Sequence, residues 1–323
     1  MKKANPDGAA DDGKGLKIDG YRRQSRPGRP LVPGGAEQNS RWKHFGTPDA
    51  NSQINSVFGP PEDMGSAASH TGTSIFDPVL CELAYSWFCP PGGLVLDPFA
   101  GGSVRGIVAG TLGRSYAGID LSETQLTANR EQAQRIFTDE APGSNLPSVR
   151  PQWHHGDSRD VATIAPGSYD FLFSCPPYAD LEVYSDDPKD LSTMSYPDFL
   201  EAYRAIIAAC AEQLRDNRFA CFVVGDIRDK HGQYRGFVGD TITAFNDVGM
   251  TLYNDAVLLT VVGSLPIRAA RPFEGSRKLG KTHQNVLVFV KGNASQAAIA
   301  CGPVEVWLPS EIQEALSVVD GTP

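Results

Sequence analysis

The sequence has 323 residues, of which 41% are hydrophobic and 21% charged, a balance typical of a globular protein with one large or two modest domains. Its formal net charge of −9 at pH 7 excludes a polycationic molecule, so any contact with nucleic acid must come from local basic surfaces. The six cysteines show no CxxC or CxxxC spacing, which argues against zinc and disulfides and favours reduced, buried thiols. No apolar run approaches membrane-spanning length and no hydrophobic signal region opens the chain, so we expect a cytoplasmic protein without a membrane partner.

Residues 1–72 are rich in Gly, Pro, Asn, Ser and Asp and have almost no apolar periodicity, which predicts a flexible N-terminal extension. This extension is basic in its middle part, where only Asp19 and Glu37 oppose Lys14, Lys17, Arg22, Arg23, Arg26, Arg29, Arg41 and Lys43. Two interpretations stay open, a solvated tail and an arm that contacts DNA phosphates.

An alternation of helix and strand patterns begins near residue 75. Asp77 followed by Pro78 is a favourable helix start, and the apolar residues up to Phe88 fall on one face. The next elements predicted are a buried strand at 94–97, a glycine-bearing turn at 98–103 with a helix to 113, a strand at 115–120, a helix with a capping box from 122 to about 137, and a strand at 151–155.

A fourth strand ends in a proline step at residues 170–178. Its apolar run from Phe171 to Phe173 has no polar alternation, which is typical of a strand buried on both faces. The two prolines that follow cannot donate to a sheet ladder, so the strand must stop there and Tyr178 stands at the tip. Because ligand crevices lie at the carboxyl ends of parallel strands, this step is expected to border a pocket.

Further elements complete a single fold pattern. They are a helix capped at 195–198, a strand at 218–225, a helix at 236–248, strands at 251–262 and 285–290, and a short amphipathic helix at 309–319. The last two strands leave no room for a helical crossover, so we expect an antiparallel pair joined by a long loop. The pattern predicts a doubly wound, Rossmann-like α/β fold with seven strands in residues 73–292, followed by a C-terminal tail, 293–323.

The glycine turn and a second acid mark one candidate ligand site. Glycines allow the backbone to approach a ligand closely, and Asp120, which closes the second strand, can accept both hydroxyls of a ribose. The alternative is an ordinary strand–helix turn with Asp120 as a helix cap. Features at four consecutive strand ends favour a nucleoside cofactor.

Three motifs resemble those of DNA amino-methyltransferases, which act on cytosine N4 or adenine N6. The stretch Asp97-Pro98-Phe99-Ala100-Gly101-Gly102 resembles their cofactor motif, Ser174-Cys175-Pro176-Pro177-Tyr178 resembles their catalytic motif, and residues 284–291 resemble their late strand. The resemblance covers roughly residues 75–292. It implies a methyltransferase sheet, S-adenosylmethionine as cofactor, and methyl transfer to the exocyclic amino group of a base flipped out of duplex DNA.

The resemblance also implies roles for individual residues. Asp97 would lie near the methionine amino group by way of the turn, Asp120 on the ribose hydroxyls and Asp157 near the adenine amino group. At the catalytic motif, the Pro176 carbonyl would accept a hydrogen bond from the target amine and the Tyr178 ring would stack on the base. The cofactor residues implied are Thr73, Ser74, Phe76, Asp97, Phe99, Ala100, Gly101, Gly102, Asp120, Leu121, Asp157 and Ser158.

The chain departs from the family pattern at two positions. Ser103 stands where the second turn glycine is usual, which would narrow the freedom of the turn. Cys175 replaces the usual Asp, Asn or Ser, and its thiol is a weak hydrogen-bond partner that Ser174 could support. The nucleophile of cytosine-carbon methyltransferases follows its proline, so covalent catalysis by Cys175 is disfavoured. Both target bases stay open, with cytosine slightly favoured because cysteine is close to serine in shape.

The segment between the last two strands is basic, with the single acid Glu274 among Arg268, Arg271, Arg277, Lys278 and Lys281. We interpret it as a loop that contacts DNA phosphates, with a solvated loop as the alternative. The loop after the catalytic motif is acidic instead. It would be a lid over the base pocket or a solvated loop, and Tyr184 is a second candidate to stack on the base.

Two other functions stay open at this point. RNA and protein-amide methyltransferases also contain Pro-Pro-Tyr, and a DNA-binding protein could retain this fold after losing catalysis through Ser103 and Cys175. No restriction module is visible in the sequence, so the resemblance is compatible with an orphan or phage-type enzyme, and a role in restriction-modification stays open.

Overall fold

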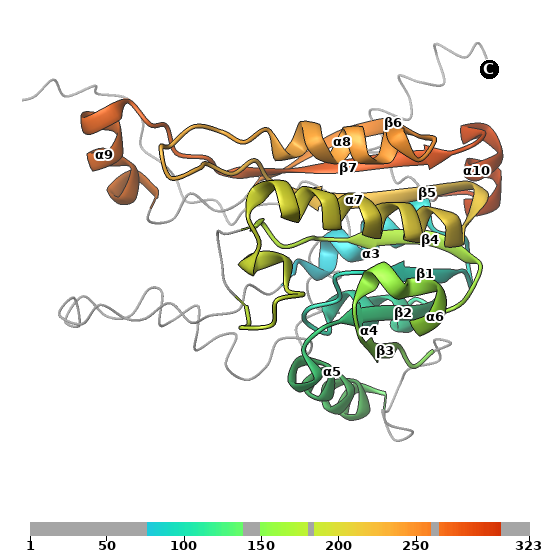
Figure 1. Ribbon diagram of the computed structural model, residues 1–323. Helices are drawn as coiled ribbons and strands as arrows, with labels where there is room; N and C mark the ends of the chain where they lie inside the picture. Colours follow the sequence, from blue (N-terminus) through green and yellow to red (C-terminus); the bar gives the residue numbers. More distant parts are fainter. Residues whose placement is uncertain (1–75, 138–148, 180–183, 260–264, 305–323) are drawn as a thin grey trace, which may run out of the picture. The chain divides into compact units, whose positions relative to one another are not determined.

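A computed structural model describes residues 76–137, 149–179, 184–259 and 265–304, except the side chains of 266–268. Seven strands form one sheet in the order β3-β2-β1-β4-β5-β7-β6 (Figure 1). Strands β1 to β5 pair in parallel, whereas β7 is antiparallel to both β5 and β6. The strands are β1 (Leu94–Asp97), β2 (Ser115–Asp120), β3 (Gln152–His155), β4 (Tyr169–Ser174), β5 (Leu214–Val224), β6 (Met250–Leu259) and β7 (His283–Lys291). The predicted doubly wound, Rossmann-like α/β fold with an antiparallel last strand is confirmed.

Helices cover both faces of this sheet. One group, with its own core cluster, consists of α3 (Pro78–Phe88), α4 (Val104–Thr111), α5 (Glu123–Ile136) and α10 (Ala294–Cys301). The other consists of α6 (Val161–Ile164), α7 (Tyr196–Gln213) and α8 (Phe237–Asp247), which lie in front of the sheet in Figure 1. The predicted helix starts are confirmed at Asp77, Ser122 and Ser195, because each of these side chains accepts a hydrogen bond from a backbone N–H in the first helical turn.

Strand β4 lies near the middle of the sheet and is buried along its whole length. Phe171 and Phe173 belong to the core cluster under α3, whereas Tyr169 and Leu172 belong to the cluster under α7. Full burial of each of these apolar side chains contributes roughly 1.5–3 kcal/mol. The absence of polar alternation in the sequence of β4 therefore has a direct physical cause, since both faces of the strand are covered by helices.

Three helices differ from the expectation, and the shortest of them, α6, was not predicted. The segment between β6 and β7 was predicted to be a loop, but residues Leu265–Ser276 form helix α9, which contains Pro272. A proline inside a mostly exposed segment hides such a helix from a sequence pattern. Helix α10 was not predicted, because a segment of eight mostly small residues is too short to show a helical pattern of apolar residues. Its residues Ala297 and Cys301 are nevertheless buried.

The structure also bears on two simpler predictions. No disulfide joins the six cysteines, which all lie within the described residues, and five of them are buried. In the described part of the chain, no helix has the length and apolar character needed to cross a membrane. The N-terminal extension with Thr73 and Ser74, the loop at 142–147 and the helix expected at 309–319 lie outside the described residues.

Candidate active site at the carboxyl ends of the strands

The direction in which successive strands are added to the sheet reverses between β1 and β4. From β1 the chain continues to β2 on one side, whereas β4 is followed by β5 on the other side. Such a switch point opens a crevice at the carboxyl ends of the two strands, where ligands bind in open α/β sheets. Asp97 closes β1 and Ser174 closes β4, so both predicted motifs begin at this crevice.

Asp97 joins the two motifs. Its side chain is completely buried, and Oδ1 accepts hydrogen bonds from the Phe99 N–H (3.2 Å) and from the Ser174 hydroxyl (2.6 Å). Oδ2 accepts from Arg105 Nε (2.6 Å) and from the Tyr116 hydroxyl (2.7 Å). With four donors on one carboxylate, Asp97 holds the turn after β1 to the end of β4.

Arg105 is a functional residue that sequence reasoning missed. It is buried, and its Nη2 donates to the carbonyl oxygens of Phe99 (2.6 Å) and Ala100 (3.0 Å) while its guanidinium lies 4.7 Å from the centroid of the Phe76 ring. Burial alone would lower the pKa of Arg105, but the adjacent Asp97 carboxylate raises it above its ordinary value. The arginine therefore stays charged and fixes the backbone of the turn. An arginine within the first turn of an otherwise apolar helix was the signal available in the sequence.

The turn itself needs only one unusual backbone conformation. Gly101 has φ of +49°, its N–H donates to Asp120 Oδ2 (2.9 Å), and its carbonyl accepts from Asn129 Nδ2 (2.7 Å). Ser103 has φ of −72°, which any residue adopts, and its hydroxyl donates to Gln132 (2.6 Å). A serine at this position is therefore compatible with the turn and causes no backbone strain.

Asp120 closes β2 and Asp157 follows the end of β3, and the two carboxylates have different surroundings. Asp120 accepts from the N–H groups of Gly101 and Ser122, and burial raises the pKa of its carboxyl despite these bonds. For Asp157, burial alone would raise the pKa, but hydrogen bonds from the Arg159 side chain and backbone lower it instead. Ser158 is buried and donates to the Pro98 carbonyl (2.5 Å). Asp157 is thus already paired within the chain.

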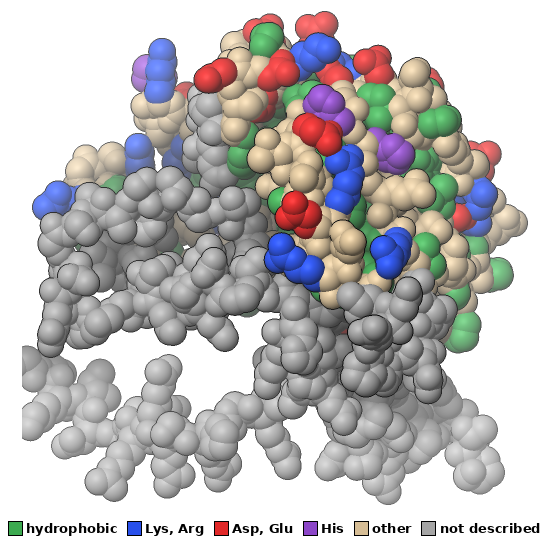
Figure 2. All heavy atoms as spheres, turned by 90° about the horizontal axis from the view of Figure 1, so that it is seen from below, with side chains coloured by type: hydrophobic (Ala, Val, Ile, Leu, Met, Phe, Trp, Pro, Cys, Tyr) green, Lys and Arg blue, Asp and Glu red, His purple; other side chains and the backbone are tan. Residues whose placement is uncertain are grey.

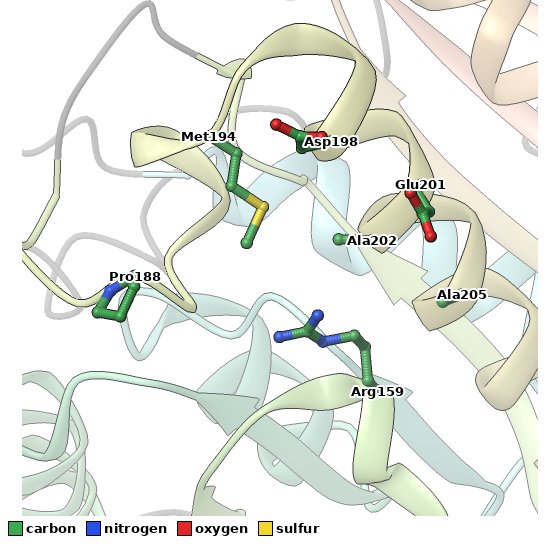
Figure 3. Close-up of a pocket in the computed structure, with 7 residues that line it drawn as sticks. All are labelled: Arg159, Pro188, Met194, Asp198, Glu201, Ala202 and Ala205. Atoms are coloured by element: carbon green, nitrogen blue, oxygen red, sulfur yellow. The ribbon is translucent and has the colours of Figure 1, made fainter.

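A hollow of about 440 Å³ lies beside Arg159 (Figure 3). Figure 3 shows the Arg159 guanidinium and the Met194 side chain pointing into this hollow, with Asp198 and Glu201 on α7 above it. Pro188, Ala202 and Ala205 complete its lining. Among these lining residues, only Arg159, which binds Asp157, links the hollow to the candidate site.

The catalytic motif contains one side chain that faces inward. Ser174 is completely buried and donates to Asp97, so it does not support Cys175 at the crevice as the sequence suggested. Cys175 is half-buried, and its Sγ lies 3.9 Å from the Tyr178 hydroxyl. Ala179, directly after Tyr178, is buried with φ of +46°, a conformation that is uncommon for a residue other than glycine. The proline step is therefore followed directly by a backbone conformation that is unfavourable for a residue with a side chain.

Tyr178 is fixed through both its hydroxyl and its ring. Gln284 Nε2, at the start of β7, donates to the hydroxyl. The ring meets Phe237 edge-on, with centroids 6.2 Å apart and an interplanar angle of 89°. The backbone of Gly225, at the end of β5, lies against the same tyrosine.

The basic residues predicted to contact DNA lie at the same end of the sheet as the crevice. Because β7 is antiparallel to β5 and β6, the segment from the end of β6 to the start of β7 lies at the carboxyl ends of the parallel strands. Arg271 is exposed on α9, and Arg277, Lys278 and Lys281 follow this helix. The visible charged side chains at α9, at the left of Figure 2, are basic, whereas basic and acidic side chains are mixed elsewhere on that face. The side chain of Arg268 is outside the description.

A hairpin at residues 226–236 adds a further cationic side chain near the basic residues that follow α9. Arg228 pairs with Tyr234 across the hairpin, and its guanidinium lies 3.8 Å from the centroid of the exposed Tyr234 ring. The Lys278 side chain lies against Gly232 of this hairpin, at a position that a β-carbon would occupy. Two segments distant in sequence thus bring cationic side chains together beside the step.

Comparisons with known proteins concern the fold only. No protein-family model matches the sequence, and no curated protein sequence matches it significantly. Among solved structures, TrmN from Thermus thermophilus matches with 17% identity over 67% of this chain, which spans only 49% of TrmN (TM-score 0.43). The magnesium protoporphyrin IX methyltransferase of Synechocystis PCC 6803, solved with bound SAM, matches with 14% identity over 78% of this chain and 96% of its own (TM-score 0.42). A methyltransferase from Pyrococcus furiosus matches with 13% identity over 76% of this chain and 98% of its own (TM-score 0.45).

Proposed function

We propose that the protein is a methyltransferase that moves a methyl group from S-adenosylmethionine to the exocyclic amino group of a base in DNA. The observation that carries the proposal is the Asp97 carboxylate, which binds both the glycine turn and the Ser174 hydroxyl. One buried group thereby fixes the motif expected to hold the cofactor against the motif expected to hold the methyl acceptor. Transfer between two bound reactants depends mainly on such relative positioning.

The cofactor would be held by three strand ends. The glycine turn, whose backbone Arg105 fixes, lies where the methionine end is expected, and Asp120 is the candidate acceptor for the ribose hydroxyls. Because all four hydrogen bonds of Asp97 come from within the chain, Asp97 would act on the cofactor only through the turn. When bound, S-adenosylmethionine supplies a methyl group already activated by its sulfonium.

The protein's own part in the reaction would be to orient the target amine. The Pro176 carbonyl is the candidate acceptor for an amine N–H, and the ring of Tyr178 is the candidate surface for the base. On the cofactor side, Asp157 is bound by Arg159. A contact of Asp157 with the adenine amino group of S-adenosylmethionine would therefore have to share that carboxylate. Cytosine N4 and adenine N6 are both compatible with this arrangement.

DNA is the preferred substrate because the basic residues of α9 and of the segment after it lie at the carboxyl ends of the strands, and those residues can bind phosphates. A base in a duplex must be flipped out before its amino group can reach a crevice. RNA presents the same phosphates and the same amino groups, so the experiment has to include it.

The test is incubation of the protein with isotope-labelled S-adenosylmethionine and duplex DNA, RNA or a protein lysate, followed by mass spectrometry of nucleosides and amino acids. We expect label on N4-methylcytosine or N6-methyladenine from DNA, and none with Tyr178→Ala. Label found only in RNA or protein would overturn the DNA assignment. Absence of cofactor binding in calorimetry would overturn the enzyme assignment and favour a non-catalytic DNA-binding protein.

A further inference from the structure

A line of three side chains runs through the catalytic step. Gln284 of β7 donates to the Tyr178 hydroxyl, and this hydroxyl lies 3.9 Å from Cys175 Sγ. The first of these contacts joins residues 106 positions apart in the sequence, so only the folded sheet creates it. Nothing in the motif resemblance assigns a role to Gln284.

The surroundings of Tyr178 restrict the hydrogen-bond partners that its hydroxyl can reach. Phe237 packs edge-on against the ring. Gly225 lies so near that a β-carbon at this position would be in van der Waals contact with Tyr178. Burial is the main reason why the pKa of Tyr178 lies far above its ordinary value, so the hydroxyl keeps its proton at neutral pH. Tyr178 therefore acts as a neutral group with one proton to donate and one oxygen to accept.

The first hydrogen bond leaves the phenolic proton available for a second one. Because the Gln284 amide donates to the phenolic oxygen, the phenolic proton can go to another acceptor. The Cys175 sulfur is close enough to accept it, and either group can be the donor in this contact. A sulfur that accepts from Tyr178 has its S–H directed away from the tyrosine.

We propose that Gln284 is a positioning residue, which holds the Tyr178 ring and, through the tyrosine hydroxyl, orients the Cys175 thiol at the step where the target amine would bind. The proposal rests on the proposed function for its catalytic consequence but not for its structural part. Gln284 is assigned no contact with substrate or cofactor.

The structural part is tested without any substrate, by alkylation of Cys175. Peptide mass spectrometry would follow the modification of this half-buried thiol, with the five buried cysteines as internal references. Gln284→Leu frees the tyrosine and is expected to change the alkylation rate of Cys175 by about threefold or more. The control Asn285→Leu removes a hydrogen bond to Asp255 from the neighbouring position of β7 and should leave that rate unchanged. An unchanged rate in Gln284→Leu would overturn the proposal.

The catalytic part is tested by a double-mutant cycle. Gln284→Leu should lower kcat about tenfold while the KM for the cofactor stays the same, because orientation of the acceptor and not cofactor binding is lost. In a Tyr178→Phe background the same change should have no further effect, since Gln284 acts through the hydroxyl. Additive effects of the two substitutions would overturn the proposal.

The isosteric variant Gln284→Glu guards against a folding defect. A carboxylate keeps the shape of the side chain but can only accept from Tyr178, which reverses the direction of the hydrogen bond. We expect its kcat to fall towards that of Gln284→Leu, whereas a kcat equal to that of the wild type would overturn the orientation of the thiol. If wild-type protein methylates none of the substrates offered, the proposed function fails, but the alkylation result still decides the role of Gln284.

Discussion

Two buried aspartates lie at opposite ends of neighbouring central strands and use their carboxylates for different purposes. Asp97, at the carboxyl end of β1, binds a turn, a serine, a tyrosine and Arg105. Asp170, near the amino end of β4, binds the Leu94 N–H (3.1 Å), Arg215 (2.7 Å) and Arg218 (3.0 Å). Both are arginine-paired carboxylates, so charge pairing alone does not distinguish a functional site from a structural one.

The position of each aspartate along the strands makes the distinction. Asp170 joins the amino-terminal parts of β1, β4 and β5, where the backbone is irregular too, because Gly92 and Asn217 have positive φ and the register of β4 and β5 shifts at Asp170. Asp97 joins the glycine turn to a step with a positive φ at Ala179, where the chain leaves the sheet. The difference teaches that a buried ion pair points to a ligand site when it lies at strand carboxyl ends, whereas irregular backbone beside it is no guide.

The largest effect is expected from Asp97→Asn. The amide leaves the buried Arg105 without a counter-charge, which should destabilise the protein by about 3–5 kcal/mol, as removal of one partner of a buried pair does. Cofactor binding should be lost as well, since the turn loses its anchor. Denaturant unfolding and calorimetry with S-adenosylmethionine measure the two effects. Retention of cofactor affinity at a temperature where the variant is folded would show that the turn does not depend on Asp97.

Tyr178→Ala should separate function from stability at the same end of the sheet. We expect methyl transfer to fall by about 100-fold or more because the base loses its stacking surface, while cofactor affinity stays within a few-fold. Single-turnover assays with labelled cofactor provide the measurement. Cys175→Ala is the companion variant and should lose less activity than Tyr178→Ala. If Cys175→Ala were inactive with normal cofactor binding, the thiol would have a larger role than orientation.

Asp170→Asn should affect stability alone. We expect a loss of about 2 kcal/mol, below the range for fully buried pairs because the Arg215 side chain is half-exposed, and no change in transfer rate by the folded variant. Burial would raise the pKa of Asp170, but hydrogen bonds from Leu94, Arg218 and Arg215 lower it below its ordinary value. Its stabilising contribution is therefore complete above the unfolded pKa of about 3.9 and is lost as the pH falls through the lower folded pKa. Urea unfolding at several pH values should show that the difference in free energy of unfolding between wild type and variant disappears only at acidic pH. A difference that disappeared near neutral pH would contradict the assignment.

The smallest effect is expected from Lys278→Ala, which tests whether the crevice end also binds phosphates. Affinity for duplex DNA should fall a few-fold and the slope of log affinity against log salt should decrease by about one unit. Fluorescence anisotropy at several salt concentrations measures both quantities. Lys189→Ala, an exposed lysine in the acidic loop, is the matched control and should change neither. Equal effects of the two substitutions would indicate a general charge effect.

The strands of this fold were predictable because apolar runs bounded by glycine, proline or acids identify them, as in β1 and β4. Helix α9 was not, because Pro272 inside it is typical of a loop and not of a helix. At the candidate site, motifs located the glycine turn and the proline step. The inward position of Ser174 and the contact of Gln284 with Tyr178 were hidden, because each depends on strand register and on residues far apart in the sequence. Arg105 lies only 8 positions after Asp97, and its role was missed because it depends on how the turn between them folds back.

The position of β7 between β5 and β6 has a consequence for how the protein is made. During synthesis from the N-terminus, the turn, its arginine anchor and the proline step emerge well before β7, which is the next-to-last described element of the chain. Until β7 arrives, both β5 and β6 present unpaired edges, which favour aggregation, and Tyr178 has no Gln284 to hold it. The nascent chain can therefore complete its glycine turn early, but its proline step is completed only when one of the last strands inserts into the sheet.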